Sequence, residues 1–90
     1  MKGCTPENFE KGVLDGWEVV FLVDDIQFFY ERSCTDKGYH IVLYKDNDCI
    51  LNEDVASSHE CLERILSFEI FEKKTIRDFY DDMTVSSIFI

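Results

Sequence analysis

The stretch WEVVFLVDDIQFFYERSC, residues 17–34, decides the fold of this chain. It contains two runs of β-branched and aromatic residues, which favour β-strands, with only Asp24 and Asp25 between them. Two turn-tolerant residues between such runs predict a tight antiparallel hairpin. A turn of this length also determines which residues face each other across the strands. The predicted pairs are Val23 with Ile26, Phe21 with Phe28, and Val19 with Tyr30.

Successive side chains of a β-strand point to opposite faces of a sheet, so the hairpin and the strand predicted at residues 39–45 each have two faces. The predicted core face carries Trp17, Val19, Phe21, Val23, Ile26, Phe28, Tyr30, Ile41 and Leu43. The predicted outer face carries Glu18, Val20, Leu22, Gln27, Phe29, Glu31, His40, Val42 and Tyr44. A slip of one residue in the pairing would exchange the two faces.

The segments around this meander predict helices and further strands. Helices are predicted at residues 5–16, 57–71 and 73–83, where capping residues precede apolar positions at helical spacing. A short fourth strand is predicted at residues 49–52 and a last strand at residues 84–90. The order predicts an α+β fold: an antiparallel β-meander of three to four strands, short helices packed on one face, and a C-terminal strand. The length is that of one domain, residues 1–90.

The segment IRDFYDDM, residues 76–83, concentrates acidic residues. On a helix its apolar residues share one side, and Asp78, Asp81 and Asp82 share the other. Thr75 is predicted to cap this helix, with Asp78 as the acid of a capping box. The like charges repel, and acids at a helix C-terminus oppose its dipole. We interpret the aspartates as a solvated face or as a contact for a basic partner. A divalent metal fits less well, because it needs more converging oxygens.

The overall charge excludes one class of partner. The chain has 19 acidic and 9 basic residues and a net charge of −10. Nucleic-acid binding needs clustered Lys and Arg, so we expect no nucleic-acid partner. No apolar run approaches the roughly 20 residues that span a bilayer, and no charged-then-apolar leader is present. We therefore expect a cytoplasmic protein that does not enter a membrane and that meets a partner with a basic surface.

Cysteine and histidine spacing gives no sign of a metal site or of catalysis. The four cysteines form no CxxC pair, and only His59 and Cys61 are close in sequence. We expect reduced, mostly buried thiols, with two disulfides as the alternative. No Gly-rich phosphate loop and no marked nucleophile is present. The alternative is a Cys/His pair that folding assembles from His40 and either Cys34 or Cys49. The prediction is a non-enzymatic protein without a cofactor.

The outer face is more apolar than a solvated sheet face. Its apolar residues are Val20, Leu22, Phe29, Val42 and Tyr44. Its polar rim consists of Glu18, Gln27, Glu31 and His40. An aromatic-rich patch with a polar rim is typical of a protein-binding surface. The alternative is that a helix covers this face as well.

Two resemblances accompany these patterns. The ending KKTIRDFYDDMTVSSIFI, residues 73–90, is similar to the tails of small uncharacterised bacterial proteins. In these, an "sLrel..d..v..i" ending follows a strand-rich start with a G-x-x-V-x-F-x-Y run. Residues 16–21 and 76–88 carry the likeness, which implies no activity and no site residues. By size, charge and fold class, the chain also resembles small acidic immunity proteins, which neutralise secreted toxins.

We therefore predict a small, acidic, non-enzymatic protein-binding domain of the immunity or inhibitor type, which neutralises a basic partner. The predicted contact residues are Asp78, Asp81, Asp82, Glu72, Phe29, Val42, Tyr44 and His40. One alternative is a homodimeric structural module, with residues 85–90 or the apolar sheet face as its seam. A small-ligand binder or enzyme is a further alternative, for which a deep pocket beside His40 would be the sign.

Overall fold

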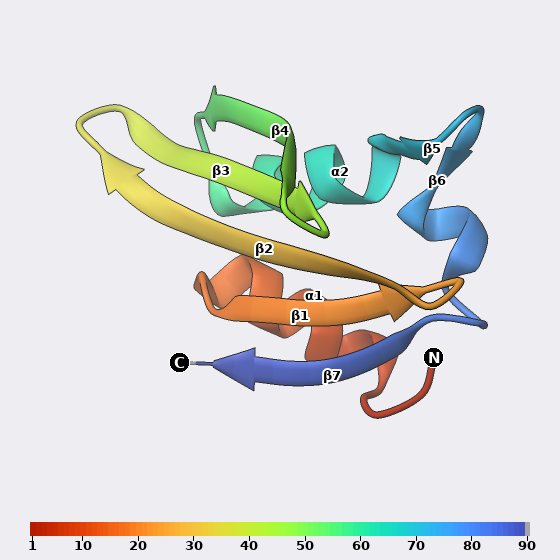
Figure 1. Ribbon diagram of the computed structural model, residues 1–90. Coiled ribbons are helices and arrows are strands. Elements are labelled where there is room, and N and C mark those ends of the chain that lie inside the picture. Colours follow the sequence, from red (N-terminus) through yellow and green to blue (C-terminus); the bar gives the residue numbers. More distant parts are fainter. Residues whose placement is uncertain (90) are drawn as a thin grey trace.

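The computed structural model describes residues 1–89, so Ile90, the end of the predicted last strand, lies outside the described residues. The described chain forms a five-stranded antiparallel sheet in the order β4-β3-β2-β1-β7, together with a small β5-β6 sheet (Figure 1). The predicted α+β fold is confirmed. The helices are α1 (Pro6–Asp15), α2 (Ser58–Ser67) and the 3-10 helix η1 (Ile76–Phe79). The strands are β1 (Glu18–Val23), β2 (Ile26–Thr35), β3 (Gly38–Lys45), β4 (Asp48–Val55), β5 (Glu69–Phe71), β6 (Lys74–Thr75) and β7 (Thr84–Phe89).

The hairpin of β1 and β2 has the predicted register, from Val23 opposite Ile26 to Val19 opposite Tyr30. Its turn is as tight as predicted, and both turn residues have positive φ, 51° at Asp24 and 64° at Asp25. This left-handed conformation matches the twist of the strands, but side chains with a Cβ adopt it at a cost.

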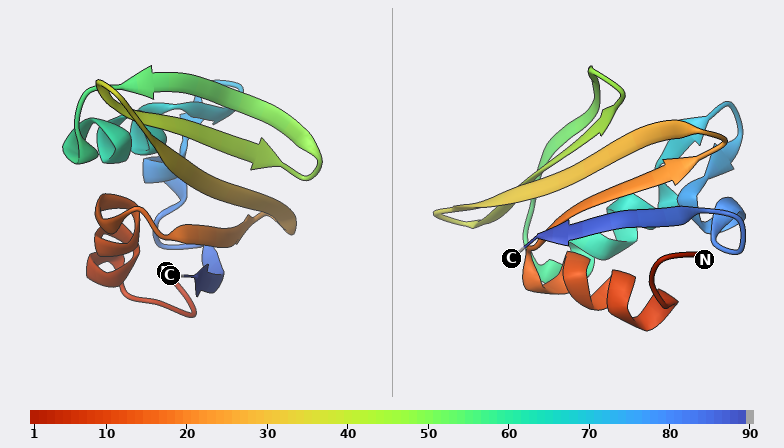
Figure 2. Two further views of the ribbon diagram at one scale, coloured as in Figure 1. Left: turned by 90° about the vertical axis from the view of Figure 1, so that its left-hand side faces the viewer. Right: turned by 60° about the horizontal axis from the view of Figure 1, so that its bottom comes forward.

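Both α-helices lie on the same face of the sheet, and the core lies between them and the strands (Figures 1 and 2). The predicted core residues that are buried are Val19, Phe21, Val23, Phe28, Tyr30, Ile41 and Leu43. Trp17 and Ile26 are only partly buried. Ile26 is the first residue after the hairpin turn, and Trp17 precedes β1, with the Lys11 ammonium 5.2 Å from its ring centroid.

The predicted caps of the two α-helices are present. Thr5 Oγ1 accepts a hydrogen bond from the Asn8 N–H at 3.2 Å, and Ser57 Oγ accepts one from the Glu60 N–H at 3.2 Å. Gly16 ends α1 with φ 81°, a conformation that suits glycine. The caps explain why both helices begin where the sequence predicts.

The C-terminal third differs from the prediction of two helices over residues 57–71 and 73–83. The first helix ends at Ser67, and β5 pairs with β6 in a small hairpin. This pairing uses Lys74 and Thr75 as strand residues, so only the short η1 fits before β7 begins at Thr84. The predicted interaction of Thr75 with Asp78 is nevertheless present, since the Thr75 N–H donates to Asp78 Oδ2 at 2.8 Å.

Strand β7 is paired along one side with β1 and forms one edge of the sheet. Strand β4, longer than the predicted residues 49–52, forms the other edge. The small β5-β6 sheet and η1 gather at the end of the large sheet where β7 begins (Figure 1). The two edges, the uncovered face and this crowded end are therefore the surfaces to consider for function.

Candidate functional site

The outer sheet face, defined by Val20, Leu22, Phe29, Val42 and Tyr44, is not covered by any helix of residues 1–89 (Figure 2). All of these side chains are partly exposed, whereas the residues that alternate with them along the strands are buried. The alternative in which a helix also covers this face is therefore wrong for the described chain.

Aromatic residues stand at the centre of the outer sheet face. Phe29 pairs with Val20 of β1 on one side and with Tyr44 of β3 on the other. The ring centroids of Phe29 and Tyr44 are 6.1 Å apart, and the rings are inclined by 33°. Aromatic side chains have few rotatable bonds, so a packed pair presents contact area that is already ordered before a partner binds.

His40 lies beside this face, where β3 pairs with β4. Its Nδ1 is 2.7 Å from Asp54 Oδ1, and the two residues are register partners. The hydrogen bond to Asp54 raises the pKa of His40 above its ordinary value of 6.5. Among the described residues, the ring bonds to this carboxylate and to neither Cys34 nor Cys49. His40 is therefore a rim residue whose ring is held against the Asp54 carboxylate.

The predicted acidic contacts, Glu72, Asp78, Asp81 and Asp82, are all exposed. Asp78 has a structural task, because it caps η1 through Thr75. The α-helical face on which the aspartates were predicted to gather does not exist, since η1 has only four residues.

Asp81 and Asp82 belong instead to a larger group at one end of the sheet. The β1-β2 and β3-β4 turns lie at the same end, as shown by the 2.7 Å hydrogen bond from the Asp46 N–H to the Gln27 carbonyl. Asp82 extends past the same end, because Thr84 pairs with Leu22. We call this group the acidic end. It consists of Asp24, Asp25, Asp46, Asp48, Asp81 and Asp82.

All members of the acidic end are exposed, and none forms an ion pair with any residue from 1 to 89. Lys45, next to Asp46 in the sequence, faces an aromatic ring: its Nζ is 4.3 Å from the Phe71 ring centroid. Sequence reasoning missed four of these six aspartates. The sequence could have predicted that these aspartates lie together, because every second turn of an antiparallel meander lies at the same end of the sheet.

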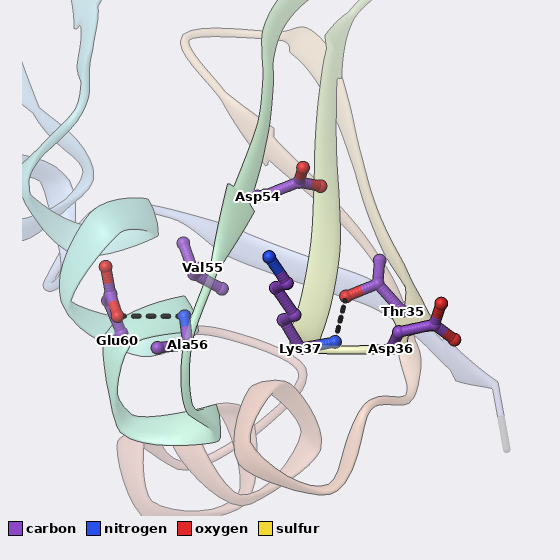
Figure 3. Close-up of a pocket in the computed structure, with 7 residues that line it drawn as sticks. All are labelled: Thr35, Asp36, Lys37, Asp54, Val55, Ala56 and Glu60. Atoms are coloured by element: carbon purple, nitrogen blue, oxygen red, sulfur yellow. Dashed lines mark hydrogen bonds between the residues drawn. The ribbon is translucent and has the colours of Figure 1, made fainter.

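An open hollow of about 550 Å³ lies at the opposite end of the meander (Figure 3). Its lining residues are Thr35, Asp36, Lys37, Asp54, Val55, Ala56 and Glu60. The two hydrogen bonds between them are local: Lys37 N–H to Thr35 Oγ1 in a turn, and Ala56 N–H to Glu60 Oε2 at the start of α2. These bonds hold the backbone of the β2-β3 turn and of the start of α2.

All four cysteines are free thiols. Cys61 is buried and Cys4 partly buried, but Cys34 and Cys49 are exposed, so the prediction of mostly buried thiols is wrong. Cys34 lies near the far end of β2, and Cys49 lies in the edge strand β4. Within residues 1–89, no three His, Cys, Asp or Glu side chains are arranged to hold a metal ion.

The comparisons with known proteins add no relative. No family model matches the chain, and neither the curated proteins nor the solved structures contain a match. The resemblances to small bacterial proteins and to immunity proteins therefore stay predictions. None of the helices in residues 1–89 has the length and hydrophobicity needed to cross a lipid bilayer.

Proposed function

We propose that this protein binds another protein through the outer sheet face and performs no chemistry of its own. The observation that carries the proposal is the uncovered face itself, with the ordered Phe29–Tyr44 pair at its centre. Buried aromatic anchors surrounded by a polar rim supply most of the binding energy in many protein interfaces.

The charge distribution supports a partner with a basic surface. The chain carries a net charge of −10, and the acidic end continues from the same strands that form the outer sheet face. Unpaired exposed carboxylates attract a basic protein over a distance of about a Debye length, roughly 8–10 Å at moderate salt. Such attraction speeds association and selects the partner, while the aromatic pair stabilises the complex afterwards.

An inhibitor of the immunity type is the role that fits these features best. A small domain that presents an acidic and aromatic surface can cover a basic functional surface of a larger protein and block it. The support consists of the charge, the open face and the resemblance by size and fold class.

The test separates the aromatic contribution from the electrostatic one. The bait is the full chain, used to purify a partner from the cells that produce it, and the partner is then measured by titration against purified variants. We expect a basic partner whose binding weakens at least tenfold in Phe29→Thr/Tyr44→Thr, because threonine keeps the strand but removes both anchors. Equal affinity of this variant and the wild type would refute the outer sheet face as the contact.

The electrostatic contribution is tested with Asp81→Asn/Asp82→Asn. Asp78 is left unchanged, because it caps η1 and its loss would weaken that helix for structural reasons. The matched control is Glu7→Gln/Asp36→Asn, which removes the same charge from exposed positions elsewhere. We expect slower association and a weaker dependence on salt only in the first variant. The same change in both variants would show that net charge matters and the acidic end does not.

A further inference from the structure

The two edges of the sheet differ in how they are protected. An edge strand offers unpaired N–H and C=O groups, and proteins usually guard it with charges or bulges. Edge strand β4 carries Asp48, Glu53 and Asp54 and has an irregular register with β3 near Tyr44. Edge strand β7, with the sequence TVSSIF, carries no charged residue, although acidic residues make up 19 of the 90 in the chain.

Among residues 1–89, only the beginning of β7 is protected by another part of the chain. Lys2 lies beside this part, with its N–H donating to the Met83 carbonyl at 2.9 Å and its carbonyl accepting from the Val85 N–H at 2.8 Å. From Ser86 to Phe89, no described strand pairs with the outer side of β7. Phe89, in this free part, is 51% exposed and is the large apolar side chain most open to solvent in residues 1–89.

A groove of about 550 Å³ runs next to this free edge, between β7 and α1. Its lining residues are Gly3, Cys4, Asn8, Lys11, Trp17, Val85, Ser86, Ser87 and Ile88. An added strand would place its inward side chains in this groove, against the partly buried Trp17 and Ile88. The lining includes a lysine and no carboxylate, whereas the hollow beside the β2-β3 turn includes Asp36, Asp54 and Glu60.

We propose that the free edge of β7 pairs antiparallel with β7 of a second copy of this chain. Two molecules with a net charge of −10 repel each other, so a contact surface without carboxylates opposes association least. The free edge and its groove meet this condition, and a neutral strand is suited to pair with itself about a two-fold axis. The axis is perpendicular to the sheet, which brings the outer sheet faces of both copies onto the same side of one continuous sheet.

This dimer is independent of the proposed function, because its contacts lie at the edge and leave the outer sheet face open. A seam built from a short strand and a groove is small, so we expect reversible association that rises with concentration rather than a permanent dimer. A dimer would present two copies of the binding face side by side, which would favour a partner with two sites.

The test is light scattering of the purified chain, coupled to size exclusion, from low micromolar to several hundred micromolar concentration. We expect the wild-type mass to rise from that of one chain toward that of two. In Ser87→Lys/Phe89→Lys the dimer should weaken at least tenfold, because the seam would then hold two like charges from each copy. Lysine lowers the net negative charge, so a general electrostatic effect would change association in the opposite direction.

The matched control is Cys49→Lys/Asn52→Lys, which places the same charges at exposed positions of the other edge and should dimerise at least as well as the wild type. Hydrogen exchange of the wild type needs no variant: amide protection in residues 86–89 should rise with concentration. A monomer throughout the range, or a dimer that survives the β7 substitutions, would overturn the proposal. A dimer lost in Phe29→Thr/Tyr44→Thr instead would place the seam on the outer sheet face and would overturn it as well.

Discussion

The Tyr30 hydroxyl is buried in the core without a hydrogen-bond partner among the described residues. Burial raises the pKa of this phenol far above its ordinary value of 10, and the neighbouring Cys61 thiol adds to the rise. A buried hydroxyl without a partner destabilises the folded state, because it has lost its hydrogen bonds to water. The ring of the same tyrosine fills space in the core.

Tyr30→Phe removes the hydroxyl and keeps the ring. We expect the free energy of unfolding to stay the same or to rise by up to about 1 kcal/mol, measured by urea denaturation. The control is Tyr44→Phe, where the hydroxyl lies on the open outer sheet face and its loss should have little effect. A loss of more than about 1 kcal/mol in Tyr30→Phe would mean that the hydroxyl has a partner after all.

The pair of His40 and Asp54 makes stability depend on pH with a defined sign. The pKa of His40 is raised in the folded state, chiefly by its hydrogen bond to Asp54. The stabilisation is therefore complete below the unfolded pKa of about 6.5 and is lost as pH rises through the folded pKa. In Asp54→Asn the free energy of unfolding should depend less on pH, and NMR titration should show a lower pKa for His40 than in the wild type. An unchanged His40 titration in that variant would contradict the assignment.

At the scale of elements, the β1-β2 turn contains removable strain. Asp24 and Asp25 both have positive φ, and their adjacent charges repel. Asn-Gly is the preferred pair for a two-residue turn of this conformation. We expect Asp24→Asn/Asp25→Gly to raise the free energy of unfolding by about 1 kcal/mol, measured by thermal or urea denaturation.

The control for this turn is Asp36→Asn/Asp48→Asn, which removes the same charge from residues outside the positive-φ region. If the gain comes from backbone conformation, the control should stabilise clearly less than the turn variant. Equal gains would assign the effect to charge and not to strain.

The sequence predicted those elements whose signals are local. The hairpin register follows from a two-residue turn and the two-residue period of the strands, and the helix starts follow from Thr5 and Ser57. The third helix was wrong, because residues 73–75 also suit a turn and a short strand, and only the packed structure selects β5-β6 pairing. Propensity is a weak guide where such tertiary contacts decide.

For the whole molecule, the sequence predicted the position of one surface correctly and that of another only in part. The outer sheet face follows from strand alternation, and the structure leaves it open. The acidic end was predicted only in part, because Asp78, Asp81 and Asp82 were assigned to one helix, whereas the group forms where the strand turns meet. The exposure of Cys34 and Cys49 was not predicted either, because burial depends on which face of the sheet the helices cover.

The acidic end predicts opposite effects on stability and binding. Its six exposed aspartates repel one another without an ion pair among residues 1–89. Neutralising Asp81 and Asp82 by Asn should therefore raise the melting temperature at low salt, and added salt should raise that of the wild type more than that of the variant. The melting curves are compared with those of Glu7→Gln/Asp36→Asn.

The same variant should bind a basic partner more weakly, since the removed repulsion is what the partner relieves. Surface charges kept for stability alone would behave differently, because their loss would lower the melting temperature. A variant that associates with the partner as fast as the wild type, and with the same dependence on salt, would therefore contradict a binding role for the acidic end. Higher stability with slower, less salt-dependent association would support one, because the two aspartates would then destabilise the monomer and speed its encounter with the partner.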